Sequence, residues 1–178
     1  MIFTRTPLSG AVLVDLERHE DERGFFARSW CQREFRAAGL SDRLVQASLS
    51  FTRRRGTLRG LHYQGPPHEE DKLVRCTHGA IWDVIVDLRP ASATYLRHYA
   101  LELRADSGRA LFVPTGCAHG FQTLEDETQV FYQMSAFYAP DAGRGIRWND
   151  PRFRISWPIP DPILHPRDAA YPDYRSLA

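Results

Sequence analysis

The sequence lacks most features of secreted, membrane-bound or nucleic-acid-binding proteins. Its three cysteines, Cys31, Cys76 and Cys117, are odd in number and widely spaced, so neither a disulfide framework nor a zinc ribbon is expected. Long apolar runs are missing, and the opening MIFTRTPLSG has no apolar stretch of the kind found in signal peptides. The 23 basic and 22 acidic residues nearly balance, which gives no bulk attraction to nucleic acid or to an anionic membrane. We therefore expect a cytoplasmic protein that binds neither.

Lysine is almost absent as well. Among the 23 basic residues only Lys72 is a lysine, and the others are arginines. A coding bias toward arginine is the simplest cause. Against that bias, a single ammonium group suggests a position where a compact point charge is needed and a planar guanidinium will not serve. Lys72 is therefore a candidate functional residue.

Helical patterns are scarce too, and strand patterns are frequent. Only residues 31–38, which Gly39 ends, look helical. Strands are expected over residues 79–88, 94–104, 110–113 and 128–138. In the first of these, the even-numbered side chains share one face and the odd-numbered ones the other. This pattern predicts one all-β domain over residues 1–178, an antiparallel sandwich or jelly roll, with a Pro-rich segment after residue 148 that wraps its surface.

Two phrases hold side chains suited to acid–base or metal chemistry. RRRGTLRGLHYQ, residues 53–64, would place Gly60, His62 and Gln64 on one face of a strand, and PTGCAHGF, residues 114–121, reads as a turn that presents His119. The PxGxxH pattern resembles the second signature of the cupin jelly rolls. A metal cupin would carry His-x-His in the first signature, whereas here an amide follows His62. Two histidines do not supply the three or more donors of a transition-metal site, so no metal is expected.

A more specific resemblance rests on six phrases in a fixed order. They are LRGLHYQ, DKLVRCTHGAIWDVIVDLRPASATY, VPTGCAHGFQTLED, FYAP, IRWNDP and, at the end, HPRD. Together they resemble the dTDP-4-dehydrorhamnose 3,5-epimerase family, and the resemblance starts near DERGFF, residues 21–26, and ends near residue 168. It implies a cupin-type double-stranded β-helix, usually a homodimer, that uses no metal or other cofactor. Such enzymes epimerise the carbons that flank the C4 ketone of a nucleotide-linked 4-keto-6-deoxy sugar.

The resemblance implies four catalytic residues. His62 matches the base, and an imidazole can both take and return a proton near neutral pH. Asp168 matches the carboxylate that orients this imidazole. Lys72 matches the cation beside the C4 oxygen, where it would stabilise the enolate. Tyr132 matches the acid that returns a proton from the opposite face. Taken singly each would be an ordinary structural residue, and only their joint occurrence in matched phrases favours catalysis.

The resemblance also implies a substrate-binding set. Groups near the pyrophosphate would be arginines, whose forked donors suit phosphate oxygens, and one histidine. Aromatic side chains would flank the nucleotide, one of them reaching in from the partner subunit. The pocket would be shared in a homodimer whose interface includes residues 23–26. The matched residues are Arg23, Arg59, Arg167 and His119 near the pyrophosphate, Tyr138 and Phe26 near the nucleotide, and Gln46 and Ser48 where the family has Q-x-N.

Three positions depart from the family pattern, and in the family all three lie toward the nucleotide. Arg28 stands where the family has Glu, Ser48 where it has Asn, and Gly143 where it has a second Glu. An arginine cannot accept a hydrogen bond from a base N–H as a carboxylate does. The reaction is therefore more firmly predicted than the nucleotide.

The expected function is the 3,5-epimerisation of dTDP-4-dehydro-6-deoxyglucose to dTDP-4-dehydrorhamnose in deoxysugar biosynthesis. Epimerisation at C3 alone, or on another nucleotide sugar, is the first alternative. A 3,4-ketoisomerase would move the ketone from C4 to C3, and a non-catalytic sugar-binding jelly roll would bind without exchanging protons. A metal-dependent oxygenase is the last alternative, and loss of activity on adding a chelator would favour it.

Overall fold

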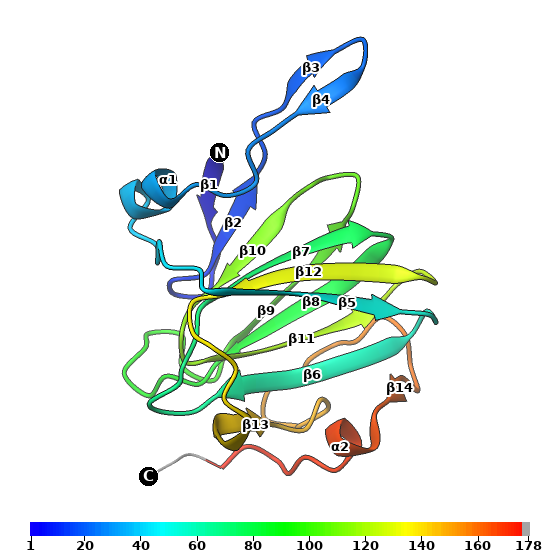
Figure 1. Ribbon diagram of the computed structural model, residues 1–178. Helices are drawn as coiled ribbons and strands as arrows, with labels where there is room; N and C mark the ends of the chain where they lie inside the picture. The colour runs from blue at the N-terminus through cyan, green and yellow to red at the C-terminus, as the bar shows by residue number, and fades with distance from the viewer. Residues whose placement is uncertain (176–178) are drawn as a thin grey trace.

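Two antiparallel sheets face each other in the computed structural model, which describes residues 1–175 (Figure 1). One sheet contains, in order, β1 (Ile2–Arg5), β2 (Val12–Asp15), β10 (Ala110–Val113), β7 (Lys72–His78), β12 (Thr128–Met134) and β5 (Gln46–Thr52). The other contains β13 (Gly143–Gly145), β6 (Thr57–Gln64), β11 (Cys117–Thr123), β8 (Ala80–Asp87) and β9 (His98–Arg104), and β14 (Ile163–Leu164) pairs with β6. We call them the β7 sheet and the β8 sheet. The predicted all-β jelly roll is confirmed.

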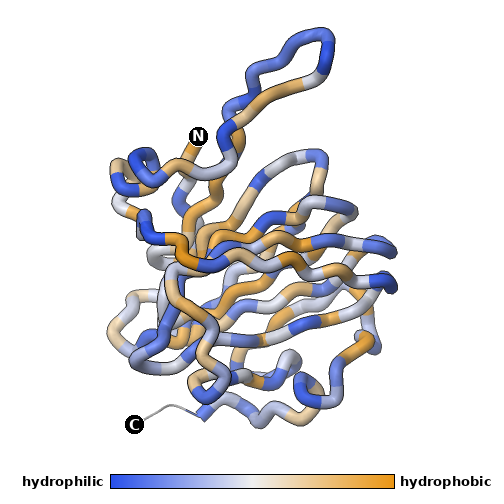
Figure 2. Tube along the Cα trace, viewed as in Figure 1, coloured by the Kyte–Doolittle hydropathy of each residue, from blue (hydrophilic) through white to orange (hydrophobic). Residues whose placement is uncertain are grey.

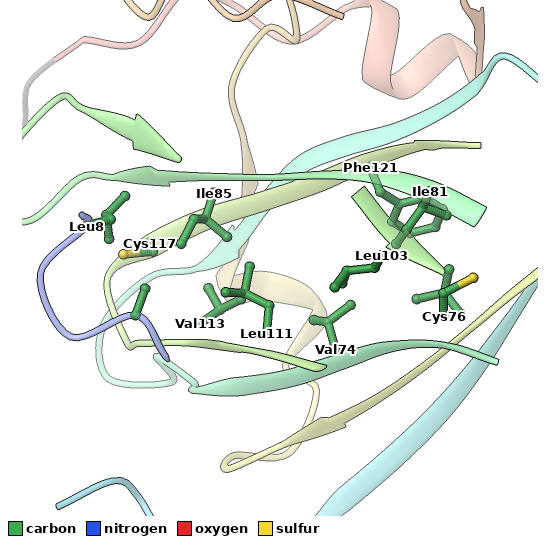
Figure 3. Close-up of a cluster of buried hydrophobic side chains, with 12 residues drawn as sticks. Leu8, Val74, Cys76, Ile81, Ile85, Leu103, Leu111, Val113, Cys117 and Phe121 are labelled. Atoms are coloured by element: carbon green, nitrogen blue, oxygen red, sulfur yellow. The ribbon is translucent and has the colours of Figure 1, made fainter. Parts of the chain in front are cut away.

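The main core lies between the inner faces of the two sheets (Figure 3). Val74 and Leu111 of the β7 sheet meet Ile81, Ile85 and Leu103 of the β8 sheet. The alternation predicted for residues 79–88 is confirmed, because the even-numbered side chains of β8 belong to a second cluster on the outer face. A polar residue at an odd-numbered position of β8 therefore points between the sheets.

Each sheet has an outer cover supplied by a different end of the chain. Phe35 of helix α1 (Gln32–Ala37) packs with Val14 and Phe112 on the outside of the β7 sheet. Phe153 and Tyr174 of the C-terminal segment pack on the outer face of the β8 sheet. The predicted wrapping by the Pro-rich segment is confirmed, and Figure 1 shows this segment running along the β8 sheet toward β13.

A short hairpin projects away from both sheets (Figure 1). It consists of β3 (His19–Asp21) and β4 (Gly24–Phe26), which pair only with each other in the described part of the chain. Phe25 and Phe26 are exposed, the latter to 74%, although the strand that carries them is apolar in Figure 2. A two-stranded hairpin that joins neither sheet is at best marginally stable by itself.

Several predicted boundaries were wrong, each for a local reason. The strand expected at residue 94 begins at His98, because a turn in which Leu96 has a φ of 63° precedes it. The strand expected to reach residue 138 ends at Met134. Sequence reasoning also missed the strands before residue 27, the 3-10 helix η1 (Pro140–Ala142) and helix α2 (Pro166–Ala169).

The three cysteines carry free thiols, and those of Cys76 and Cys117 are buried in the core. Burial raises the pKa of the Cys76 thiol to about 11 and that of Cys117 to about 12, so both stay protonated. Within residues 1–175, neither helix has the length and apolar character needed to cross a membrane.

Candidate active site

A histidine–aspartate pair joins the β8 sheet to the C-terminal segment. His62, on β6, has its Nε2 2.8 Å from Oδ1 of Asp168, and the imidazole is one-third exposed while the carboxylate is buried. Asp168 lies in α2, where Pro166 begins the helix and the His165 side chain accepts a hydrogen bond from the Arg167 N–H. This one-turn helix fixes the aspartate against a strand that lies 106 residues earlier in the sequence.

Gly60 brings the backbone to the same carboxylate. Its N–H donates to Oδ2 of Asp168 over 3.2 Å. Its φ is +138°, and a Cβ at this position would lie 2.6 Å from the Cα of Gly120 on β11. Only glycine suits such a backbone and such a close approach. The strand bends here, as the sequence allowed, and the ladder with β11 is irregular between His119 and Phe121.

The surroundings of Asp168 keep it ionised. Burial by itself would raise the pKa of this carboxyl. The hydrogen bond and the charge of His62, the Gly60 N–H and the Arg167 guanidinium outweigh burial and lower the pKa below the usual range. An ionised Asp168 accepts from a protonated Nε2, which leaves Nδ1 of a neutral His62 with its lone pair.

An ion pair lies on the facing sheet, at the start of β7. The Lys72 ammonium is 3.0 Å from Oε1 of Glu70, and the two side chains are only 11% and 9% exposed. Gln64, at the end of β6, donates to Oε2 of Glu70 over 3.0 Å and accepts from the Ala139 N–H over 2.7 Å. Lys72 is therefore held in place, and the same network holds the segment that leads from β12 to η1.

Tyr132 shares the inner face of the β7 sheet with this lysine. It pairs with Ser48 of β5 on one side and with Val74 of β7 on the other, and Val74 points into the core. Lys72 lies two residues before Val74, so it has the same orientation. His62 points the opposite way, from the inner face of the β8 sheet, because its outward neighbour Leu61 belongs to the outer cluster. The imidazole and the tyrosine thus face each other from opposite sheets.

The prediction that a turn presents His119 was wrong, because His119 lies within strand β11. It is paired with His62 across the ladder, and residues opposite each other in an antiparallel pair point to the same face. Its Nε2 is 2.7 Å from Oδ1 of Asp83, which is fully buried. Asp83 occupies one of the inward, odd-numbered positions of β8. A second histidine–aspartate pair therefore lies on the neighbouring strand, opposite the first.

The predicted substrate-binding residues divide into two groups. Arg59 donates to Thr52 and to the Phe51 carbonyl, and so connects β6 to β5. Gln46 accepts from the Tyr138 N–H over 3.0 Å. The residues of the first group lie on strands of the two facing sheets or on segments hydrogen-bonded or joined to them. They are Arg59, His119, Gln46, Ser48, Tyr138 and Arg167.

The second group lies on or after the projecting hairpin, away from the His62–Asp168 pair, or on β13. Arg23 is exposed and pairs with Asp21, and Phe26 is exposed beside it. Arg28, which departs from the family pattern, pairs with Glu34 of α1. Gly143, another departure, lies on β13 opposite Gln64.

Three residues in contact with the site were missed by sequence reasoning. Asp83 had a visible signal, because it is an acidic residue on a face otherwise apolar in its middle. Glu70 had a weaker one, two residues before the only lysine. Tyr171, whose ring centroid lies 5.8 Å from that of His62, had none, since a Pro-rich tail shows no periodicity.

Metal ligation has little support in the arrangement of donors. Across residues 1–175, no three His, Cys, Asp or Glu side chains are grouped so that they could hold a metal ion. His62 and His119 each engage their own aspartate instead.

The two facing sheets form the fold of solved dTDP-4-dehydrorhamnose 3,5-epimerases, which are sugar-nucleotide epimerases of the isomerase class. The family model described as dTDP-4-dehydrorhamnose 3,5-epimerase matches residues 5–176. The chain belongs to this family.

Individual proteins of this family are similar to the chain in sequence and in fold. The dTDP-4-dehydrorhamnose 3,5-epimerase of Sinorhizobium fredii is 38% identical over 99% of this chain and 91% of its own length. The Bacillus anthracis enzyme, solved with TDP and PPi bound, is 38% identical with a TM-score of 0.94, covering 97% of this chain and 99% of its own. A 3'-monoepimerase from Streptomyces bikiniensis, in complex with dTDP-quinovose, is 31% identical with a TM-score of 0.86, covering 94% and 85%.

Proposed function

We propose that this protein epimerises dTDP-4-dehydro-6-deoxyglucose at C3 and C5 to give dTDP-4-dehydrorhamnose. The observation that carries the proposal is the facing arrangement: the His62–Asp168 pair on one sheet, Lys72 and Tyr132 on the other. Epimerisation removes a proton from one face of a carbon and returns a proton to the other. A base and an acid on opposite sides of the sugar ring meet that requirement.

Each inversion proceeds through an enolate. Nδ1 of His62 takes the proton from C3, and the C–H electron pair forms a C3–C4 double bond while the C4 oxygen becomes negative. The Lys72 ammonium stabilises that oxygen, worth about 3 kcal/mol for one donor by analogy with an oxyanion hole. The Tyr132 hydroxyl then gives its proton to C3 from the opposite face, and the C4 ketone reforms. Proton exchange with solvent resets both residues, and C5 follows by the same steps.

The remaining residues suit the nucleotide diphosphate. Arg59 and Arg167 offer forked donors for phosphate oxygens beside His62. Gln46 and Tyr138 lie at the end of the β7 sheet from which the chain passes to η1, and the exposed ring of Tyr138 offers a stacking surface. A diphosphate here would leave the sugar between the two sheets.

Epimerisation at C3 alone, or on another nucleotide, is the second candidate. Two observations favour keeping it: Arg28, Ser48 and Gly143 differ on the nucleotide side, and a 3'-monoepimerase is among the relatives of similar fold. The catalytic side chains would serve either reaction, because C3 and C5 both flank the ketone.

The test is NMR of dTDP-4-dehydro-6-deoxyglucose with the purified protein in deuterated water. We expect deuterium to enter at C3 and at C5. Entry at C3 alone would identify a 3-epimerase, and a ketone moved to C3 would identify a ketoisomerase. No exchange with this substrate or with its UDP, CDP and GDP counterparts would contradict the proposal and leave a sugar-binding protein.

We also propose a homodimer in the cytoplasm, with each site completed by the hairpin of the partner. The outer face of the edge strand β5 exposes Leu49 and Phe51, and the hairpin exposes Phe25 and Phe26. Apolar groups at an unpaired sheet edge favour self-association. Three free thiols suit a reducing compartment.

The dimer predicts a mass twice that of the 20.4 kDa chain in sizing with light scattering. A Phe26→Ser variant should raise KM by about tenfold, on the scale of one lost stacking contact. A monomeric wild-type protein with full activity would contradict the shared site. Phe137→Ser, which also removes an exposed ring, is the matched control.

A further inference from the structure

Tyr171 lies directly beside the proposed base, yet it belongs to none of the matched phrases. It follows α2, three residues after Asp168. Its ring centroid is 5.8 Å from that of His62, and the two ring planes meet at 71°, an edge-on contact. The same short segment thus touches the imidazole twice, through the carboxylate of Asp168 and through this ring.

Gly145 shows which side of the sheet Tyr171 occupies. On β13 it is the residue paired with His62, so a side chain here would point to the same face as the imidazole. A Cβ on Gly145 would lie 2.2 Å from two ring carbons of Tyr171. The tyrosine ring therefore fills the place of a missing side chain on the face that carries His62. Gly145 has no left-handed φ, and the three atoms nearest to such a Cβ all belong to this ring.

The ring also borders the proposed substrate-binding residues. Burial raises the pKa of the Tyr171 hydroxyl, Arg167 opposes that effect, and Asp168 and Tyr138 add to it. The hydroxyl thus stays protonated at neutral pH. It also lies within electrostatic reach of one residue proposed for the phosphates and of one proposed for the nucleotide.

A single hydrogen bond does not fix an imidazole. The Nε2 contact to Asp168 leaves the ring free to turn about the line that joins the two atoms, and such a turn moves Nδ1. A second contact from another direction removes this freedom. An error of about 1 Å in the placement of a reacting group can cost about 10²-fold in rate.

We propose that Tyr171 is a positioning residue that packs against the edge of His62 and, with Asp168, directs Nδ1 into the space between the sheets. The inference rests on the proposed function, because it assumes that His62 is the base. Gly145 is part of the same arrangement, because the absence of a side chain there provides the space that the Tyr171 ring occupies.

Four variants test the role. Tyr171→Ala should lower kcat about tenfold with KM within threefold of the wild type. Tyr171→Phe keeps the ring edge and should restore kcat to within threefold of the wild type. Gly145→Ala should reproduce the loss by displacing the ring. Gly145→Ala/Tyr171→Ala should be no worse than either single variant, because both remove one and the same contact.

An NMR readout independent of turnover accompanies the kinetics. The His62 imidazole, assigned from the signal missing in His62→Ala, should show increased ring mobility in ¹³C relaxation in Tyr171→Ala and not in Tyr171→Phe. Unchanged mobility and kcat in Tyr171→Ala would overturn the inference. A Tyr171→Phe variant as slow as Tyr171→Ala would also overturn the inference, because the effect would then come from the hydroxyl and not from the ring edge.

The controls separate this inference from the proposed function. If the wild type does not exchange deuterium, or His62→Ala exchanges it normally, the proposed function fails. If the wild type exchanges, His62→Ala does not and Tyr171→Ala matches the wild type, only the role of Tyr171 fails. Circular dichroism and thermal unfolding identify any variant that has lost its fold.

Discussion

Asparagine in place of Asp168 will lower kcat about 10³-fold while the protein stays folded. The amide cannot accept from Nε2–H with the strength of a carboxylate, and its NH₂ group favours the tautomer of His62 that carries the proton on Nδ1. The base would then be protonated at the atom that must take the substrate proton. Losses of about 10² to 10⁴ are typical when a general base or its orienting carboxylate is disabled. Deuterium wash-in at C3 measures the effect.

The effect on stability has a definite sign with pH. The pKa of Asp168 is lowered by folding, so its ionised form stabilises the native state above about pH 4, the ordinary range of aspartate, and this contribution is lost as the pH falls through the lowered value. Urea unfolding should therefore show a deficit for Asp168→Asn at pH 7 that shrinks below pH 4. Asp161→Asn, at an exposed position of the same segment, is the control and should change neither quantity. If Asp168→Asn were as active as the control, the proposed catalytic role of the His62–Asp168 pair would be refuted.

Methionine in place of Lys72 should lower kcat by about 10²- to 10³-fold, because the enolate oxygen loses its cation. It should also destabilise the protein by about 3 kcal/mol, since Glu70 would be left as an unpaired, nearly buried carboxylate. The first loss appears in the exchange assay and the second in chemical unfolding.

A double variant separates these two losses. Lys72→Met/Glu70→Gln removes the unpaired charge, and a glutamine can keep the contact with Gln64. We expect it to recover most of the stability and none of the activity. Recovery of both would show that Lys72 acts only through folding.

Strand β8 was predictable because its side chains alternate. The even and odd positions of residues 79–88 point as the alternation required, and this places Asp83 inward. The helix at residues 32–37 was predictable from its pattern and from Gly39. The turn at Leu96 was not, because a non-glycine residue with a positive φ is held there by tertiary contacts.

The site was predictable in its residues and not in its geometry. The matched phrases named His62 and Asp168, but nothing local shows that a one-turn helix brings them within 2.8 Å. His119 was expected in a turn because Pro and Gly precede it, yet the ladder with β8 starts at Cys117. Tyr171 could not be found at all, since its contact exists only once the tail has crossed β13.

The 106 positions from His62 to Asp168 also separate the residues that build the sheets from those that orient the imidazole. Every strand that builds the two facing sheets, apart from the two-residue β14, ends by residue 145. The carboxylate and the tyrosine that hold the imidazole follow more than twenty residues later. A chain whose sheets and core have formed, but whose C-terminal segment has not docked, would therefore carry its proposed base without the groups that orient it.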